Sequence, residues 1–200
     1  MRRKTFDALM TTGGLVVAIV LAVAGGLLAW GHSFAQDNVH KQLVSQQVFF
    51  PDKAALAGEK NAEIVKYVTP YAGQQVTNGT QAEVFADHYI AIHLQGVADG
   101  KTYSQVSEEW LAMKPTDPNY ATVTGQRATL FQGETLRGLL LNAYAFGKMG
   151  QIAGVASDAS FIGSGAMFLL VILGAVHMRR TKSDVEVMAW LHDKSPVPVE

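Results

Sequence analysis

Two long apolar runs dominate the pattern of this chain. Residues 8–30 contain no Asp, Glu, Lys or Arg, and neither do residues 159–178, which lie between Asp158 and Arg179. At 1.5 Å per residue, about 20 helical residues cross the roughly 30 Å hydrocarbon core of a bilayer. The pattern therefore predicts two transmembrane helices, at 8–30 and at 159–178.

Between these runs, residues 31–158 alternate polar and apolar positions at helical spacing and carry helix-start signals. Thr80 with Glu83 and Thr102 with Gln105 have the spacing of a capping box, in which each side chain satisfies a free backbone donor. Asp117-Pro118 has the cap-then-proline order of a third start. Three consecutive starts predict an all-α domain.

The apolar runs also predict what happens at the edges of this domain. Residues 37–47 continue the first helix until Pro51 stops it. Residues 133–158, rich in Leu, Ala and aromatic residues, form either a helix at headgroup level or one that rises straight out of the second span. Ser183 is expected to begin a short helix that runs through His192.

Charge sets the expected orientation. Residues 31–158 hold nine Lys and Arg against twelve Asp and Glu, whereas basic residues flank the other ends of the spans: Arg2, Arg3, Lys4, Arg179, Arg180 and Lys182. Basic residues favour the cytoplasmic side. We therefore expect an all-α plasma-membrane protein with two transmembrane helices in hairpin topology, cytoplasmic ends at 1–7 and 179–200, and a helical extracytoplasmic domain at 31–158.

A cleaved signal peptide is the alternative for the first run. Basic residues, an apolar run and Ser33-Phe34-Ala35 before Gln36 follow the order of the three signal regions. The run exceeds the roughly 7–15 residues of a signal core, which favours retention. Cleavage would leave a C-terminally anchored chain with the same domain outside.

Small residues recur along the spans and predict close helix packing. They lie four residues apart in each span, as Gly14, Ala18, Ala22 and Gly26 in the first and as Ala159 and Gly163 in the second. The partner is either the chain's own second span or another subunit. Neither span contains Asp, Glu, Lys or Arg, and Asp158 and His177 lie at opposite ends of the second one, so the pattern disfavours a pump or carrier.

Composition narrows the function classes. Charged residues make up 16% of the chain and the net charge is −1, which disfavours a nucleic-acid partner. The chain has no cysteine, so thiolate catalysis and cysteine-ligated metals are excluded. It also lacks a phosphate-binding glycine loop and a nucleophile elbow. We expect neither a cofactor nor a catalytic residue.

One polar cluster, Glu83, Asp87, His88 and His93, is a candidate metal or catalytic site, with Asp87, His88 and His93 as the possible ligands. A zinc pair on an α-helix needs histidines three or four residues apart. The five-residue spacing here places the two rings about 140° apart in an α-helix. The pattern favours a solvated polar face or core hydrogen bonds, and a metal-dependent enzyme is the weaker hypothesis.

Three phrases carry a family resemblance: QAEVFADHYIAIHL at 81–94, GKTYSQVSEE at 100–109 and GETLRGLLLNAYAFGKMGQIA at 133–153. They resemble actinobacterial two-span membrane proteins of unassigned function. The resemblance implies the hairpin topology and carries over no catalytic residue.

These patterns lead to two hypotheses on function. The first is a non-catalytic accessory or assembly subunit of a larger cell-envelope membrane complex, with a respiratory complex as one candidate. Its partners would be the lipid bilayer and other membrane protein subunits. The alternative is an extracytoplasmic sensing or ligand-binding module anchored by two spans.

Overall fold

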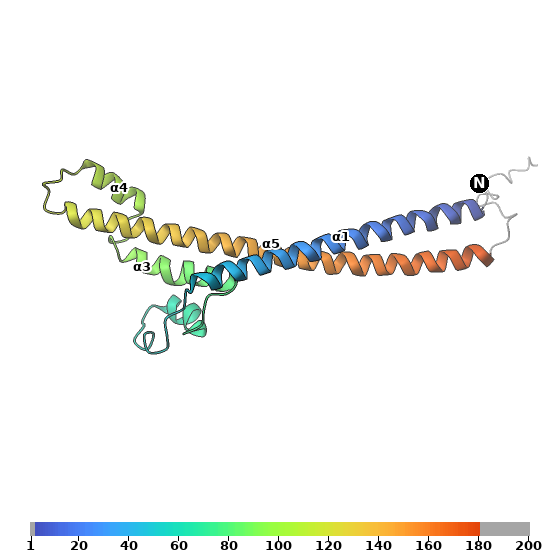
Figure 1. Cartoon of the computed structure of the whole chain (residues 1–200), viewed down its shortest axis with the longest axis horizontal. Coiled ribbons are helices and arrows are strands. Elements are labelled where there is room, and N and C mark those ends of the chain that lie inside the picture. The colour runs from blue at the N-terminus through green and yellow to red at the C-terminus, as the bar shows by residue number, and fades with distance from the viewer. Residues whose placement is uncertain (1–2, 181–200) are drawn as a thin grey trace, which may run out of the picture. The chain divides into compact units, whose positions relative to one another are not determined.

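The computed structural model describes residues 3–180 and is helical throughout, with no β-strand in that range. Two long helices dominate it, α1 (Arg3–Gln46) and α5 (Tyr120–Arg180) (Figure 1). Each contains a stretch long and apolar enough to cross a membrane. The expected all-α class and the two long apolar helices are confirmed.

Short helices connect the two long ones. In chain order they are η1 (Ile64–Val68), η2 (Thr69–Tyr71), α2 (Gly79–Phe85), η3 (Ala86–Ile90), α3 (Ala91–Gln95) and α4 (Tyr103–Ala112). Two of them, η1 and η3, are π-helical turns, and η2 is a 3₁₀-helix. Such π-turns are rare and frequently occur at functional sites.

The capping signals are only partly correct. Thr102 forms the predicted capping box with Gln105 at the start of α4. At α2, the prediction of Thr80 as the cap is wrong, because the Asn78 side chain accepts the backbone N–H of Gln81 at 3.0 Å. Asn is among the strongest N-cap residues, and the helix begins two residues earlier than a cap at Thr80 implies.

The long helices extend well past the apolar runs. α1 continues to Gln46, as predicted, and Gln47 then takes a left-handed φ of 53°. Of the two alternatives for residues 133–158, the structure has the straight one, because α5 is unbroken from Tyr120 to Arg180. The Asp117 carboxylate accepts the Asn119 N–H at 2.9 Å just before that helix. The helix predicted from Ser183 lies outside the described residues.

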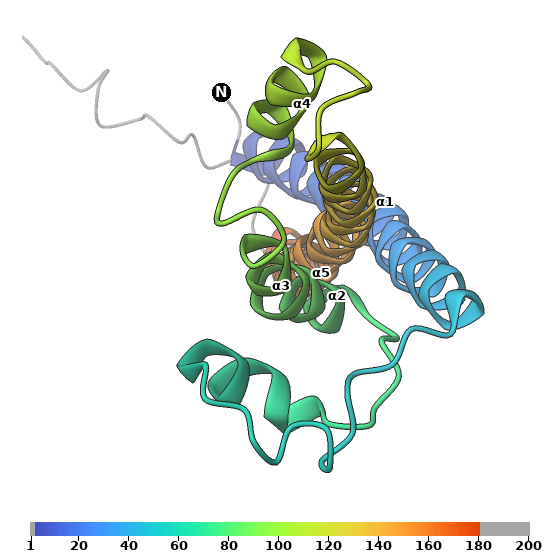
Figure 2. The same cartoon turned by 90° about the vertical axis from the view of Figure 1, so that its left-hand side faces the viewer.

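The chain divides into two compact units, which we treat separately. Residues 3–31 and 153–180 form the unit that we call the helix pair. Residues 32–152 form the second, which we call the helical domain. Within the helical domain, α2 and α3 lie on one side of α5 and α4 lies on another (Figure 2).

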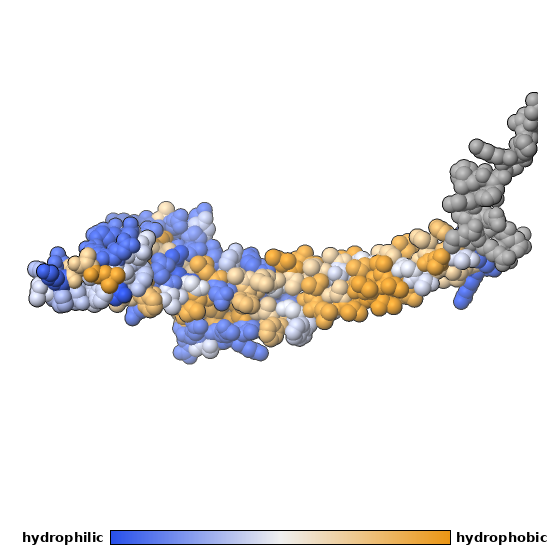
Figure 3. Space-filling view, turned by 90° about the horizontal axis from the view of Figure 1, so that it is seen from above, coloured by the Kyte–Doolittle hydropathy of each residue, from blue (hydrophilic) through white to orange (hydrophobic). Residues whose placement is uncertain are grey.

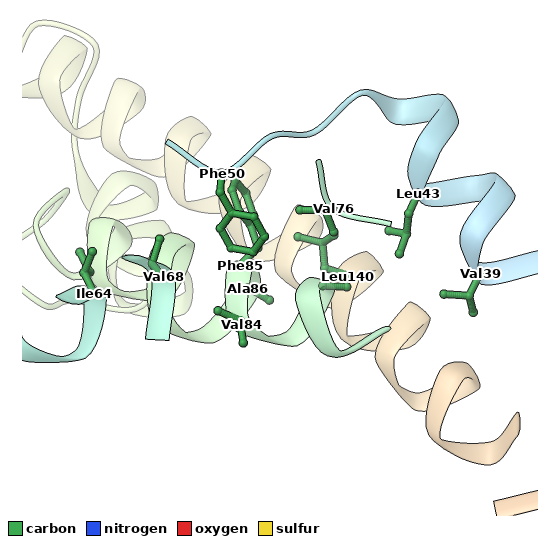
Figure 4. Close-up of a cluster of buried hydrophobic side chains, with 11 residues drawn as sticks. Val39, Leu43, Phe50, Ile64, Val68, Val76, Val84, Phe85, Ala86 and Leu140 are labelled. Carbon is green, nitrogen blue, oxygen red and sulfur yellow. The ribbon is translucent and has the colours of Figure 1, made fainter. Parts of the chain in front are cut away.

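The core of the helical domain joins the ends of α1 and α5 to the short helices. Figure 4 shows this cluster, which comprises Val39, Leu43, Phe50, Ile64, Val68, Val76, Ala82, Val84, Phe85, Ala86 and Leu140. A second cluster holds α4 against α3 and α5 with Leu94, Ala98, Val106, Val123 and Leu130. These clusters cover only part of the circumference of α5.

Candidate functional site

Small residues bring the two helices of the helix pair into close contact. A methyl group added at Gly25 would lie 3.1 Å from the Phe161 ring, and one at Gly14 would lie 3.2 Å from Val171. Ala18, between them, is completely buried. Because the residues at these contacts are glycines and an alanine, the two backbones can approach each other closely, as membrane helices with small interfacial residues do.

Two buried serines tie the same helices together. Ser157 Oγ donates to the Gly25 carbonyl oxygen and Ser164 Oγ donates to the Ala18 carbonyl oxygen, both at 2.8 Å. Donors and acceptors are each seven residues apart in sequence, so the bonds repeat with a heptad period. The helix pair therefore has a seam in which the hydroxyls of both buried serines are satisfied by backbone carbonyls of the other helix.

The seam only partly uses the small residues that the sequence pointed to. Gly14 and Ala18 lie on it, and Ala22 is half-buried. A methyl group added at Gly163 would lie 3.4 Å from the Leu21 side chain. Gly26 and Ala159 are exposed. Four helical residues turn about 400°, which is about 40° more than a full turn, so three four-residue steps move a stripe about 120° around the helix. Steps that alternate between three and four residues stay on one face. That alternation was the signal that could have identified Gly25.

The cluster of Asp87, His88 and His93 does not converge on one point. Asp87 pairs with Arg137 at 2.9 Å, and His88 Nδ1 lies 2.9 Å from a Glu63 carboxylate oxygen. His93 Nδ1 lies 2.7 Å from the Tyr89 carbonyl oxygen. Among the described residues, no three potential ligands gather at a point that would hold a metal ion.

The π-helical turn η3 changes the geometry on which the 140° estimate rested. That estimate assumed an unbroken α-helix, whereas η3 spans His88 and follows the wider i→i+5 pattern. The His88 ring instead stacks on Tyr67 of η1, with centroids 3.9 Å apart and planes 15° from parallel. The π-turn thus serves packing between η1 and η3, because it orients His88 toward Tyr67 and Glu63.

Arg137 fastens this region to α5. Its guanidinium donates to Asp87, to Glu134 at 2.8 Å and to the Ala86 carbonyl oxygen at 3.2 Å. Partial burial disfavours the charge, but the hydrogen bonds and attraction of Asp87 and Glu134 outweigh it and raise the pKa of Arg137. The guanidinium is therefore a structural clamp on the covered side of the helix.

On another side of α5, a face of the helical domain is left open. We call it the α5 face and define it by eight exposed residues: Ala128, Phe131, Thr135, Gly138, Asn142, Ala145, Met149 and Ile152. Their spacing alternates between three and four residues, and none of them is charged. Phe131 is 56% exposed, Met149 64% and Ile152 69%. Apolar stripes of this kind normally pack against another element, and exposed ones mark interaction surfaces.

A groove runs beside the α5 face, between the parts of α1 and α5 that belong to the helical domain. Its volume is about 210 Å³. Phe34, Asn38 and Gln42 line it from α1, and Leu139, Asn142 and Phe146 from α5, and no charged residue lines it. A space of this size accommodates a few apolar side chains or a small molecule, with amide groups to orient it.

Comparisons with known proteins give no family: no protein-family model matches this chain, and neither does any curated protein or solved structure.

The residues of the α5 face were not among the candidates that the sequence predicted. Their alternating spacing is visible in the sequence, but their exposure is not, because it depends on which sides of α5 the other elements between residues 3 and 180 cover.

Proposed function

We propose that this chain is a non-catalytic accessory or assembly subunit of a larger cell-envelope membrane complex, and that its helical domain docks on other subunits. The observation that carries the proposal is the α5 face, an uncharged stripe of the helical domain that residues 3–180 leave exposed. Large apolar side chains that gather on one exposed, uncharged face of a domain mark a surface that another molecule covers. A respiratory complex is one assembly of this kind.

The exterior of the helix pair supports anchoring in a membrane. Only 11% of the most apolar 18-residue window of α1, and 6% of that of α5, is buried. A core helix of a water-soluble domain would have most of such a window buried. Figure 3 shows the resulting hydrophobic surface along the helix pair. The proposal places both helices in the plasma membrane as a hairpin with cytoplasmic termini and the helical domain outside.

The distribution of charge and the resemblance to actinobacterial two-span proteins belong to the same proposal. Acidic residues exceed basic ones in residues 31–158, and Arg179 and Arg180 follow the second apolar stretch. This asymmetry fits the tendency of basic residues to remain in the cytoplasm. In this proposal the helix pair, which the two serine hydrogen bonds hold together, anchors the chain in the membrane.

Affinity purification from native membranes in mild detergent tests the proposal. The tagged wild-type chain is expected to retain other membrane proteins in stoichiometric amounts. Phe131→Glu places a charge on the α5 face and is expected to release them, whereas Thr129→Glu, also exposed but off that face, is expected to retain them. Recovery of the wild-type chain alone, or equal loss with both variants, would contradict the proposal.

The groove favours a second candidate, an extracytoplasmic ligand-binding module. Its apolar walls and amide groups match the usual composition of a small-molecule site. Native mass spectrometry of the detergent-solubilised protein tests this function. A bound molecule that is retained by the wild type and lost in Asn38→Trp, which fills the groove from an exposed position, would support it. Identical spectra for both proteins would reject it.

A further inference from the structure

We propose that the α5 face binds the same face of a second copy of this chain, in parallel and in register, with Asn142 against its counterpart. This inference rests on the proposed function: a second copy of the chain is the partner on the α5 face itself, and other subunits then dock on the paired domains, which Phe131→Glu would separate. Two copies inserted in the same direction are related by a two-fold axis along the bilayer normal, so their α5 helices run parallel.

The spacing of the α5 face is that of a two-helix seam. From residue 128 to residue 152, the eight residues of the face follow one another at alternating intervals of three and four, and further exposed residues lie on both sides of them. Helices with this 3.5-residue period pack side by side through a continuous seam. In the helix pair, α5 already packs against α1 through such a seam, in which Ser157 and Ser164 are seven residues apart.

The chemistry of the face is self-complementary, as a two-fold interface requires. Asn142, the amide at its centre, carries both donors and an acceptor, so two copies can hydrogen-bond to each other. A single Asn in an apolar seam favours parallel pairing in one register. Gly138 and Ala145 flank it in the seam and allow close approach of the backbones, since nothing lies within 4 Å of a methyl group added at Gly138.

Charged neighbours do not oppose one another in this arrangement. Glu134 and Lys148 lie beside the seam on one edge, and in a parallel pair they face the opposite edge of the second copy. That edge presents Leu139 and Ala153 at the corresponding heights. Within residues 128–152 of α5, no like-charge contact therefore disfavours the pairing.

Large apolar side chains supply part of the area that a specific interface needs. Five large apolar side chains on and beside the face are 53–69% exposed: Phe131, Leu139, Phe146, Met149 and Ile152. At about 150–250 Å² for a fully exposed aromatic side chain, the two phenylalanines supply roughly 200 Å², and the three aliphatic side chains add to this area. A standard interface buries about 800 Å² per partner, and the small and amide residues of the face contribute to the remainder.

Cysteine cross-linking of the full-length chain in isolated membranes tests the inference, since the chain has no native cysteine. We expect an oxidant to link Asn142→Cys into a disulfide dimer in most molecules. Gly138→Cys, Ala145→Cys and Met149→Cys are expected to follow, whereas Lys148→Cys, exposed but off the seam, should yield at least tenfold less. A yield that is uniform along the helix, or absent at position 142, would overturn the inference.

A mass measurement separates this inference from the proposed function. In mild detergent, the wild-type chain is expected to be a dimer and Ala145→Glu a monomer. A monomeric wild type that still retains other proteins would overturn the dimer and leave the accessory function standing. A dimer that retains no other protein would support the pairing and contradict the accessory function.

Discussion

The helix pair and the helical domain use α5 in different ways. In the helix pair, a face of α5 with seven-residue spacing packs against α1, and Ser157 and Ser164 bond to α1 carbonyls. In the helical domain, Leu140 faces the core, whereas Asn142 and Met149 lie on an exposed face. The difference shows that a periodic pattern indicates that a face is suited to packing, but the fold decides whether the chain itself supplies the partner.

The largest expected effect comes from filling the closed seam. Gly25→Leu must displace the Phe161 ring, which lies 3.1 Å from the position of the first added carbon. We expect it to destabilise the helix pair by about 1–3 kcal/mol, as overpacking of a close contact does. Thermal unfolding in detergent, followed by circular dichroism, measures it. Gly26→Leu is the matched control, because nothing lies within 4 Å there, and an equal loss in both would contradict the seam.

A smaller effect is expected at the covered side of α5 in the helical domain. Arg137→Met removes the half-buried guanidinium that bonds to Asp87, Glu134 and the Ala86 carbonyl oxygen. The loss is expected to be about 1–2 kcal/mol, because one partner of a partly desolvated charged hydrogen bond is left behind. Urea unfolding measures it. Lys101→Met, which removes an exposed ion pair with Glu109, should leave the midpoint unchanged.

Removing one seam hydroxyl is expected to have a still smaller effect. Ser157→Ala and Ser164→Ala should each cost about 0.6 kcal/mol and at most about 1.7, the range for interhelical hydrogen bonds in membrane proteins. Ser160→Ala is the control, because that hydroxyl bonds to Ala156 within its own helix. Unfolding in detergent distinguishes the three. Equal losses at all three positions would mean that the interhelical bonds contribute nothing specific.

Zinc is expected to have no effect on stability. Asp87, His88 and His93 each bond to a different group, so one ion cannot engage them without breaking those contacts. The unfolding temperature of the purified protein should be the same in excess Zn²⁺ and in EDTA. A rise in Zn²⁺ that His88→Ala abolishes would overturn this prediction and restore the metal-site hypothesis.

The sequence was sufficient to predict the features that depend on local pattern. The two apolar stretches, the continuation of α1 to Gln46 and the Thr102 capping box all follow from neighbouring residues. Features that depend on tertiary competition were not predictable in this way. Asn78 replaced Thr80 as the cap, and two π-turns arose where η1 and η3 pack against each other.

The candidate packing residues show the same limit. Gly14 and Ala18 were found because they lie where the four-residue stripe and the seam coincide. The four-residue stripe leads to Gly26 and not to its neighbour Gly25, because a four-residue repeat rotates away from the packed face of the helix. The α5 face was not identified, since its importance depends on which side of α5 the short helices cover.

The central claim is that the α5 face is a protein-binding surface. The most direct test places a photo-activated cross-linking residue at Met149 or, as control, at Thr129, and irradiates intact cells that express the full chain. Both positions are exposed, and only Met149 belongs to the face. The account predicts a discrete protein adduct from position 149 and none from position 129. No adduct at 149, or equal adducts at both positions, would contradict it.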